Sequence, residues 1–165
     1  MIRRCRVKDT GRIYYIINEA AKAYDGVIAA DCYHQPYMPM EELEREMKRV
    51  AFYGWMINNE LVGVMGMEPI KDVTLIRHAY VLPEYQNKGI GRRLLDHLKS
   101  LTTTPRLLVG TWAAAHWAID FYRKHGFSLM PDKDKLLREY WDIPQRQIET
   151  SVVMGIEIKK NKKGN

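Results

Sequence analysis

The sequence predicts a single α/β domain, built on a mostly antiparallel, seven-stranded sheet with helices on both faces. Strand-like apolar segments and amphipathic helical segments alternate in the order β-α-α-β-β-β-α-β-α-β-β, which predicts a sandwich of this kind. The 165 residues are enough for one substantial core, and 46% hydrophobic with 28% charged residues is typical of globular proteins. We expect this domain over residues 1–158 and a basic, disordered tail over residues 159–165.

The first fifty residues predict one strand, two helices and a loop. Residues 2–7 have the composition of a strand, and Asp9 or Thr10 is suited to cap the helix that follows. The apolar positions of that helix repeat every three to four residues, at Ile13, Ile16, Ile17, Ala20, Ala21 and Tyr24. Residues 25–39, with a glycine and two prolines, predict a loop that can face a ligand. The short helix after this loop has its apolar positions at Met40, Leu43, Met47 and Val50.

The rest of the chain predicts six strands and at least two helices. The strands are expected at 50–57, 61–67, 73–82, 106–112, near 127–130 and at 148–158. The first two of them are joined by an Asn58-Asn59 turn. Helices are expected at 90–101 and 114–125. Residues 132–141 are charged with interspersed leucines, which fits a helical or an irregular segment.

A glycine-rich turn between a strand and a helix is the most informative feature of the chain. It reads Gln86-Asn87-Lys88-Gly89-Ile90-Gly91, and the helix continues with Arg92 and Arg93. Unpaired N–H groups and the positive end of the helix dipole meet at such a point. The glycines allow the backbone to approach a ligand without a Cβ, and Lys88, Arg92 and Arg93 add positive charge. The turn therefore predicts a pyrophosphate site, with an ordinary strand–turn–helix connection as the alternative.

A second segment, further along the chain, points to a known family. The turn is neither a P-loop, since no Gly-Lys-Ser/Thr ends it, nor a dinucleotide-binding motif, since its last position is Leu94. With Gln86-x-x-Gly89-x-Gly91 followed by Phe121-Tyr122-Arg123-Lys124-His125-Gly126-Phe127, the chain resembles the GNAT superfamily of N-acetyltransferases. The first motif matches the acetyl-CoA signature of that family. The motifs lie within residues 75–127, and the layout agrees over nearly the whole chain.

The resemblance implies the GNAT fold, a reaction and a set of site residues. The reaction is transfer of the acetyl group of acetyl-CoA to a primary amine, on a small molecule or a peptide, by direct attack in a ternary complex. Backbone groups of Ala79, Tyr80 and Val81 would hold the pantetheine arm, and the Val81 N–H would donate to the thioester oxygen. The turn from Gln86 to Gly91, with Arg92, would bind the pyrophosphate. Tyr122 would protonate the departing thiolate, with a packing role as its alternative.

The sequence departs from the family where the resemblance would place a general base. Relatives carry a glutamate six residues before the Val81 position or twelve before the Tyr122 position, where this chain has Leu75 and Gly110. An asparagine that touches the cofactor in relatives is replaced by Ala115. These departures keep an alternative function open, a catalytically inactive acyl-CoA-binding sensor or regulatory module.

Three side chains could replace the missing base. His78, Glu68 and His116 are the candidates, each with a structural role as its alternative, and a water chain to bulk solvent would serve equally well. A primary amine has a pKa near ~10, so some route for proton removal is needed. We leave the base unassigned at this point.

The loop at 25–39 is expected to recognise the acceptor. It gathers Asp31, Tyr33, His34, Tyr37 and Met38. Asp31-Cys32-Tyr33-His34 contains two or three potential ligands, which rarely form a metal site when they are so close together, so we favour a packed lid with aromatic anchors and expect no metal. Trp112 would line the acceptor pocket or fill the core. An aromatic-rich pocket with few unpaired acids would suit a small or partly apolar amine better than a polyamine.

Charge and cysteine content indicate partners and compartment. The net charge of +6 is dispersed and no nucleic-acid-binding signature accompanies it, so it fits a polyanionic cofactor. The alternative, a nucleic-acid-associated protein, would treat the glycine turn as a simple bend. No apolar run approaches the ~20 residues of a membrane span, and the N-terminus lacks a signal-peptide pattern. Cys5 and Cys32 make no disulfide framework, so a cytoplasmic protein is expected. Dimers are common in the family, which leaves a homodimer open.

Overall fold

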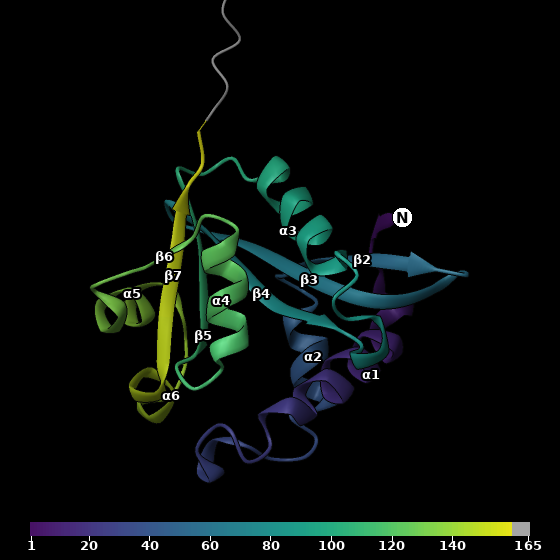
Figure 1. Cartoon of the computed structure of the whole chain (residues 1–165), viewed down its shortest axis with the longest axis horizontal. Coiled ribbons are helices and arrows are strands. Elements are labelled where there is room, and N and C mark those ends of the chain that lie inside the picture. Colours follow the sequence, from purple (N-terminus) through teal and green to yellow (C-terminus); the bar gives the residue numbers. More distant parts are fainter. Residues whose placement is uncertain (160–165) are drawn as a thin grey trace, which may run out of the picture.

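The computed structural model describes residues 1–159 and contains a seven-stranded sheet in the order β1-β2-β3-β4-β5-β7-β6 (Figure 1). The strands are β1 (Ile2–Arg4), β2 (Ala51–Ile57), β3 (Glu60–Ile70), β4 (Val73–Val81), β5 (Arg106–Trp112), β6 (Ser128–Leu129) and β7 (Ser151–Glu157). Neighbours are antiparallel except for β4 and β5, which are parallel. The predicted mostly antiparallel sheet is confirmed. The predicted disordered tail lies, beyond Lys159, outside the described residues.

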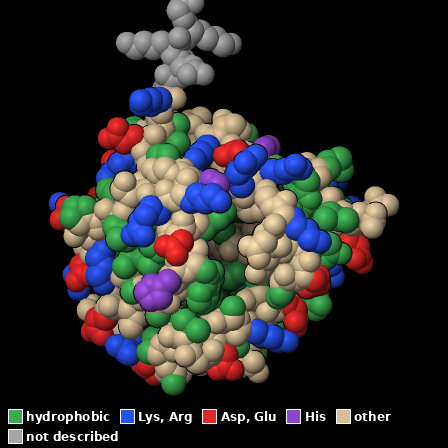
Figure 2. Space-filling view, in the orientation of Figure 1, with side chains coloured by type: hydrophobic (Ala, Val, Ile, Leu, Met, Phe, Trp, Pro, Cys, Tyr) green, Lys and Arg blue, Asp and Glu red, His purple; other side chains and the backbone are tan. Residues whose placement is uncertain are grey.

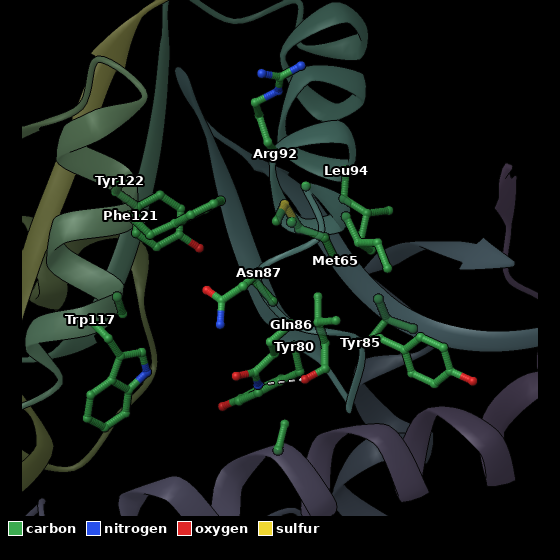
Figure 3. Close-up of a pocket in the computed structure, with 18 of the residues that line it drawn as sticks. Met65, Tyr80, Tyr85, Gln86, Asn87, Arg92, Leu94, Trp117, Phe121 and Tyr122 are labelled. Carbon is green, nitrogen blue, oxygen red and sulfur yellow. Dashed lines mark hydrogen bonds between the residues drawn. The ribbon is translucent and has the colours of Figure 1, made fainter. Parts of the chain in front are cut away.

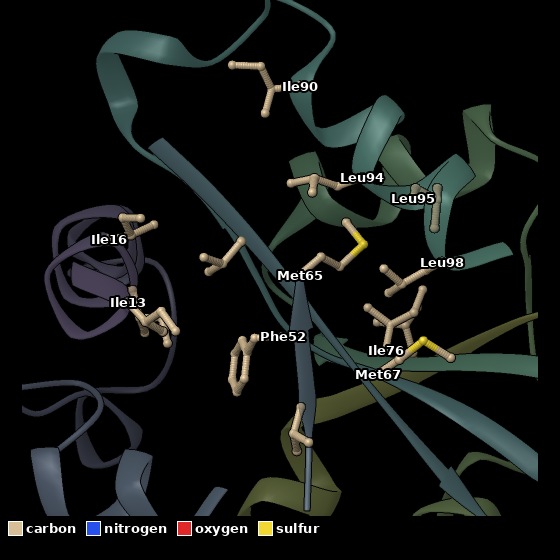
Figure 4. Close-up of a cluster of buried hydrophobic side chains, with 14 of the residues drawn as sticks. Ile13, Ile16, Phe52, Met65, Met67, Ile76, Ile90, Leu94, Leu95 and Leu98 are labelled. Atoms are coloured by element: carbon tan, nitrogen blue, oxygen red, sulfur yellow. The ribbon is translucent and has the colours of Figure 1, made fainter. Parts of the chain in front are cut away.

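The helices cover both faces of this sheet (Figure 1). One face carries α3 (Ile90–Leu101) and α4 (His116–Lys124), and the other carries α1 (Thr10–Ala21), α2 (Met40–Glu46), α5 (Lys133–Tyr140) and α6 (Gln145–Thr150). Figure 4 shows the two core layers that result, with Ile13, Ile16 and Phe52 on the α1 side of the sheet. Met65, Leu94 and Leu98 lie on the α3 side. Each is at most 2% exposed, so a continuous apolar core fixes both layers. Within residues 1–159 no helix combines the length and the apolar character that crossing a membrane requires.

Three predicted boundaries are wrong by three residues, and one of them is the end of β3, at Ile70 instead of residue 67. The first strand ends at Arg4, because residues 7–9 form a short 3-10 helix, and the Asp9 side chain does not cap α1. Its carboxylate instead accepts hydrogen bonds from the Arg3 guanidinium, at 2.8 Å, and from the Arg6 backbone N–H, at 2.7 Å. The last strand begins only at Ser151, because Pro144 has a φ of −62° that suits the start of a helix, and α6 takes up residues 145–150.

The divergence of β4 from β5 is the feature of the sheet that positions the site. The two strands pair only from Val73 to Ile76 and from Arg106 to Val109. A β-bulge follows, because Gly66 pairs with Arg77 while Val64 pairs with Tyr80, so β4 carries one extra residue against β3. Residues 77–81 consequently leave the pairing with β5 and have an open edge.

The bulge depends on two backbone features. His78 lies within it and has a φ of +53°, in the left-handed region that few non-glycine residues adopt. Gly66 lies opposite, where a Cβ would come within 2.5 Å of the Val50 side chain and 2.9 Å of the Arg77 carbonyl oxygen. A glycine is therefore needed for β3 and the bulged β4 to approach this closely.

Candidate active site

A groove of about 780 Å³ opens beside the free edge of β4, between the N-terminus of α3 and the body of α4 (Figure 3). Of the residues predicted to bind acetyl-CoA or act in catalysis, all but one line it: Ala79, Tyr80, Val81, Gln86, Asn87, Gly89, Ile90, Gly91, Arg92 and Tyr122. Lys88 does not line the groove, and its ammonium lies 5.5 Å from the centre of the Tyr85 ring. The fold thus brings together two segments that are thirty residues apart in the sequence.

The glycine turn is held so that α3 begins at the groove. Gly89 is the N-cap of α3, with a φ of +81° and open space where a Cβ would lie. Ile90 is buried in the core below, which anchors the turn. Gln86 ties the turn to the end of β4, since its Nε2 donates to the Val81 carbonyl oxygen at 2.9 Å. The first N–H groups of α3 lack acceptors within the helix, so the turn is suited to hold an anion.

The charges along the groove favour an anionic ligand. Its charged lining residues in the described part of the chain are Arg92 and Lys124, with no aspartate or glutamate beside them. Figure 2 shows the hollow, with Lys and Arg side chains around its rim. Arg93 points elsewhere, because its guanidinium lies 5.1 Å from the Trp55 ring centre. The groove therefore combines two cations with a helix N-terminus.

The open edge of β4 presents backbone donors to the same groove. Leu82 donates its backbone N–H to the Val62 carbonyl, at 2.9 Å, on the β3 side. Successive N–H groups along a strand point to opposite edges, so the Val81 N–H points away from β3, toward the side that β5 has left. An extended ligand could pair with this edge as an added strand.

Tyr122 faces the groove from α4. Its ring is buried between Phe121 and Phe127, with ring centres 5.1 Å and 5.3 Å away, and Figure 3 shows its hydroxyl pointing into the groove. Burial raises the pKa of Tyr122, with a smaller contribution from Tyr24, so the phenol keeps its proton at neutral pH. The side chain can therefore donate a proton to a group bound beside it.

A second pocket of about 290 Å³ lies on the other side of the β4 edge. Tyr24 and Tyr80 line both cavities, and their hydroxyl oxygens are 3.4 Å apart. Trp112 lines the second pocket, where its Nε1 donates to the Tyr37 hydroxyl at 2.8 Å. The two cavities thus meet at a tyrosine pair, with Val81 and Tyr122 on one side of it.

The loop at 25–39 contributes part of its predicted cluster to the second pocket. Cys32, His34, Tyr37 and Met38 line the pocket. Asp31 does not, because its carboxylate pairs with Arg146 at 2.8 Å, and Tyr33 packs on Tyr37 with ring centres 6.4 Å apart. Within residues 1–159, no three His, Cys, Asp or Glu side chains are grouped so that they could hold a metal ion.

The pocket is more acidic than predicted. Glu42, Glu46 and Asp142 line it. Glu42 and Asp142 have no ion-pair partner within the described part of the chain. This pocket therefore has two unpaired acids among the described residues, and the reason is topological. Asp142 lies more than a hundred residues from the predicted loop, and only the packing of the α5–α6 connection brings it here.

The structure distinguishes among the three candidates for the general base. Glu68 lines neither cavity, since its carboxylate oxygens are each paired with a guanidinium, Arg77 at 2.9 Å and Arg49 at 3.0 Å. His116 is exposed at the start of α4 and also lines neither cavity. His78 lines the second pocket.

The positions where relatives carry a glutamate are filled or covered. Leu75 is fully buried in a second apolar cluster of the core. Gly110 lies under the Trp141 ring, which is 3.4 Å from the place of a Cβ. Leu75 thus belongs to the core, whereas Gly110 lies at the second pocket, against the Trp141 ring.

Several groove residues have no recognisable signal in the sequence. Tyr24 belongs to the apolar repeat of α1 by spacing, yet a 3-10 turn after that helix turns its ring toward the groove. Trp117 is 48% exposed and stacks on Tyr24 with ring centres 5.9 Å apart. Spacing identifies such residues as core or surface, and only the three-dimensional contact reveals them as walls of one cavity.

Comparison with known proteins identifies the class that this fold and site define. A family model described as an acetyltransferase (GNAT) domain matches residues 48–129. The chain belongs to the GNAT superfamily of N-acetyltransferases, as the two sequence motifs predict.

Two curated relatives are similar to parts of the chain. It is 35% identical over 60 residues to an S-alkylcysteine N-acetyltransferase of Bacillus subtilis (strain 168), a match that covers 33% of this chain and 34% of the relative. It is 31% identical over 93 residues to an uncharacterized N-acetyltransferase of Oceanobacillus iheyensis, a match that covers 45% of this chain and 58% of the relative. The chain thus spans about a third and just over half of these relatives' lengths.

Solved structures share the fold over nearly the whole chain. The PaiA N-acetyltransferase of Thermoplasma acidophilum in complex with coenzyme A matches with a TM-score of 0.70 at 18% identity, covering 95% of this chain and 98% of that one. A GNAT-family acetyltransferase of Staphylococcus aureus Mu50 matches with a TM-score of 0.74 at 17% identity, covering 96% and 99%. A GNAT-family acetyltransferase of Elizabethkingia anophelis with acetyl-CoA bound matches with a TM-score of 0.66 at 21% identity, covering 95% of this chain and 97% of that one.

Proposed function

We propose that this chain is an acetyl-CoA-dependent N-acetyltransferase that acts on a primary amine by direct attack in a ternary complex. One observation carries the proposal. The open edge of β4 at Val81, the glycine turn and the Tyr122 hydroxyl all border one groove, and the charged residues that line this groove are two cations and no acid. Two of these solved structures, one in complex with coenzyme A and one with acetyl-CoA bound, share this fold, which supports the same use of the groove here.

Each part of the groove would have a separate task. The N-terminus of α3, with Gly89, Gly91 and Arg92, would hold the pyrophosphate, and the open edge of β4 would hold the pantetheine arm. When bound, acetyl-CoA would supply the thioester that the amine attacks. The Val81 N–H would stabilise the negative charge that develops on the carbonyl oxygen. Tyr122 would hold a proton for the departing sulfur, and the acceptor would enter through the second pocket.

Calorimetry on matched glycine variants tests the binding step. Gly91 and Gly11 are each the second residue of a helix, and only Gly91 lines the groove. Gly91→Glu would place a negative charge at the pyrophosphate site, beside the Phe121 ring, whereas a Cβ at Gly11 meets nothing within 4 Å. We expect micromolar acetyl-CoA binding that Gly91→Glu abolishes and Gly11→Glu leaves unchanged. Absence of binding by the native protein would refute the proposal.

A second experiment separates an enzyme from a binding module. Tyr122→Phe removes the hydroxyl and keeps the packing against Phe127. In an enzyme it should lower kcat by about 100-fold while the Kd for acetyl-CoA stays within about twofold. Tight binding without acetyl transfer to any amine in a broad panel would instead establish the acyl-CoA-binding sensor as the function.

A further inference from the structure

The second pocket contains a histidine in an unusual state. The Nε2 atom of His78 is the one side-chain nitrogen or oxygen within residues 1–159 that is fully buried and has no hydrogen-bond partner. Leaving a buried polar atom unpaired costs about 1–3 kcal/mol. The backbone of His78 is held at a φ of +53°, which adds strain. An unpaired atom on a strained residue in a pocket is the pattern expected of a functional group rather than of packing.

The two nitrogens of this ring face different surroundings. Nε2 lies 3.7 Å from Glu46 Oε2, on α2. Nδ1, unlike Nε2, is not among the fully buried unpaired atoms of residues 1–159, and the His78 side chain, 14% exposed, lines the second pocket. Phe52 stacks on the ring, with the ring centres 5.9 Å apart and the planes 13° apart, and fixes its orientation.

Glu46 is suited to support a charged imidazole. Its side chain is 7% exposed, and its carboxylate oxygens lie 3.1 Å from the Arg77 guanidinium and 3.0 Å from the Arg49 guanidinium. Burial alone would raise the pKa of Glu46, but the His78 ring and the Arg77 and Arg49 charges outweigh it and lower the pKa to about 2. The carboxylate therefore stays ionised beside Nε2 throughout the neutral range.

We propose that His78, backed by Glu46, is the general base that deprotonates the acceptor amine, an inference that rests on the proposed function. In this proposal Nε2, 3.7 Å from the Glu46 carboxylate, carries the proton, and the Nδ1 lone pair faces the pocket. Nδ1 takes one proton from the incoming ammonium, and the imidazolium is stabilised by Glu46. The freed nitrogen lone pair forms the bond to the acetyl carbon as the carbon–sulfur bond breaks. Tyr122 gives its proton to the sulfur, the second ammonium proton replaces it, and His78 releases its own proton to water.

The positions of the two cavities agree with this role. His78 is three residues before Val81 on the same strand, and the bulge turns its ring toward the second pocket. Tyr24 and Tyr80 border both cavities, so base and acid would act from opposite sides of this pair. The charged or titratable groups that share the pocket with His78 are Tyr24, Cys32, His34, Tyr37, Glu42, Glu46, Arg77, Tyr80 and Asp142.

The test compares pH profiles of His78→Asn and His116→Asn with the native enzyme. Asparagine tolerates the left-handed backbone of residue 78, and His116 is exposed and outside both cavities. We expect kcat/KM for the amine to fall about 100-fold at pH 7 in His78→Asn, with acetyl-CoA affinity unchanged. The deficit should shrink toward pH 10, where the amine is deprotonated in solution. His116→Asn should match the native profile throughout.

The contrary outcomes are distinct. A deficit that is the same at every pH would make His78 a positioning residue only, and no deficit would remove it from the mechanism. If the native enzyme transfers no acetyl group to any amine, the proposed function itself fails, and the base with it. Nitrogen-15 NMR of the native protein gives a readout that needs no variant. A proton on Nε2 with an unprotonated Nδ1 at pH 8 is expected, and the reverse tautomer would overturn the proposal.

Discussion

Replacing Arg77 by methionine should destabilise the protein by about 3 kcal/mol at pH 7. Arg77 belongs to a closed ring of two arginines and two glutamates. Its Nη1 lies 2.9 Å from Glu68 and its Nη2 lies 3.1 Å from Glu46, and Arg49 contacts the other oxygen of each carboxylate at 3.0 Å. The side chains of Glu46, Glu68 and Arg77 are 7%, 8% and 14% exposed, so only Arg49, at 52%, is open to water.

The expected size follows from two independent arguments. Removing one partner of a buried ion pair costs about 3–5 kcal/mol, because the remaining charge is left in a medium of low polarity. The pKa of Glu46 is about 2 in the folded protein against an ordinary value of 4.5. A difference of this size amounts to roughly 3 kcal/mol of stability, which His78, Arg77 and Arg49 together give the ionised carboxylate against the cost of its burial, so it is an upper bound for Arg77 alone. Since the folded pKa is the lower one, this contribution is complete above pH 4.5 and is lost as the pH falls toward 2.

Urea denaturation, followed by tryptophan fluorescence from pH 7 down to pH 3, measures the effect. The control is Arg146→Met, which removes the same side chain from an exposed ion pair with Asp31, where the two side chains are 50% and 60% exposed. Such a surface pair contributes about 0–1 kcal/mol. We expect a large loss for Arg77→Met that narrows as the pH falls below 4.5, and a small loss for the control. Equal losses in the two variants, or a loss below about 1 kcal/mol for Arg77→Met, would refute the argument.

Three further outcomes are expected. Gly89→Ala should lower the free energy of unfolding by about 1 kcal/mol in a thermal melt, because its φ of +81° is strained for alanine although the space is open. Burial raises the pKa of the Cys5 thiol to about 12, so iodoacetamide at pH 8 should label Cys32 in the native protein and leave Cys5 unmodified by mass spectrometry. Asp9→Asn should cost about 1–2 kcal/mol at pH 7, since the hydrogen bond from Arg3 chiefly lowers the pKa of Asp9 to about 2, and the loss should vanish near pH 2.

Patterns that are local in the sequence predict most of the fold. The apolar repeat of α1 and the glycine turn before α3 are confirmed because spacing, capping and turn chemistry act within a few residues. The first and last strands are predicted too long, because a short 3-10 helix and α6 contain Val7, Ile148 and Thr150, β-branched residues that also favour a strand. Propensity alone does not separate such alternatives.

The residues of the site likewise differ in whether a short segment of the sequence predicts them. The groove residues near the glycine turn and Tyr122 follow from motifs that lie within short segments. The walls of the second pocket come from the loop at 25–39, from α2, from β5 and from the α5–α6 connection, so no short segment contains the pattern. The acidity of that pocket depends on Asp142 and Glu42, which are a hundred residues apart, and it could be seen only in three dimensions.

The bulge in β4 sets the candidate base apart from the positions where relatives carry a glutamate. Position 75 precedes the bulge on β4, and position 110 lies on β5. Here Leu75 is core and Trp141 covers Gly110, so neither can act. The extra residue in β4, accommodated by Gly66, turns the His78 ring to the acceptor side while the Val81 N–H still points to the open edge. If His78 is the base, the bulge is what allows a single strand to serve both substrates, and a variant that regularises β4 should lose acetyl transfer while keeping affinity for acetyl-CoA.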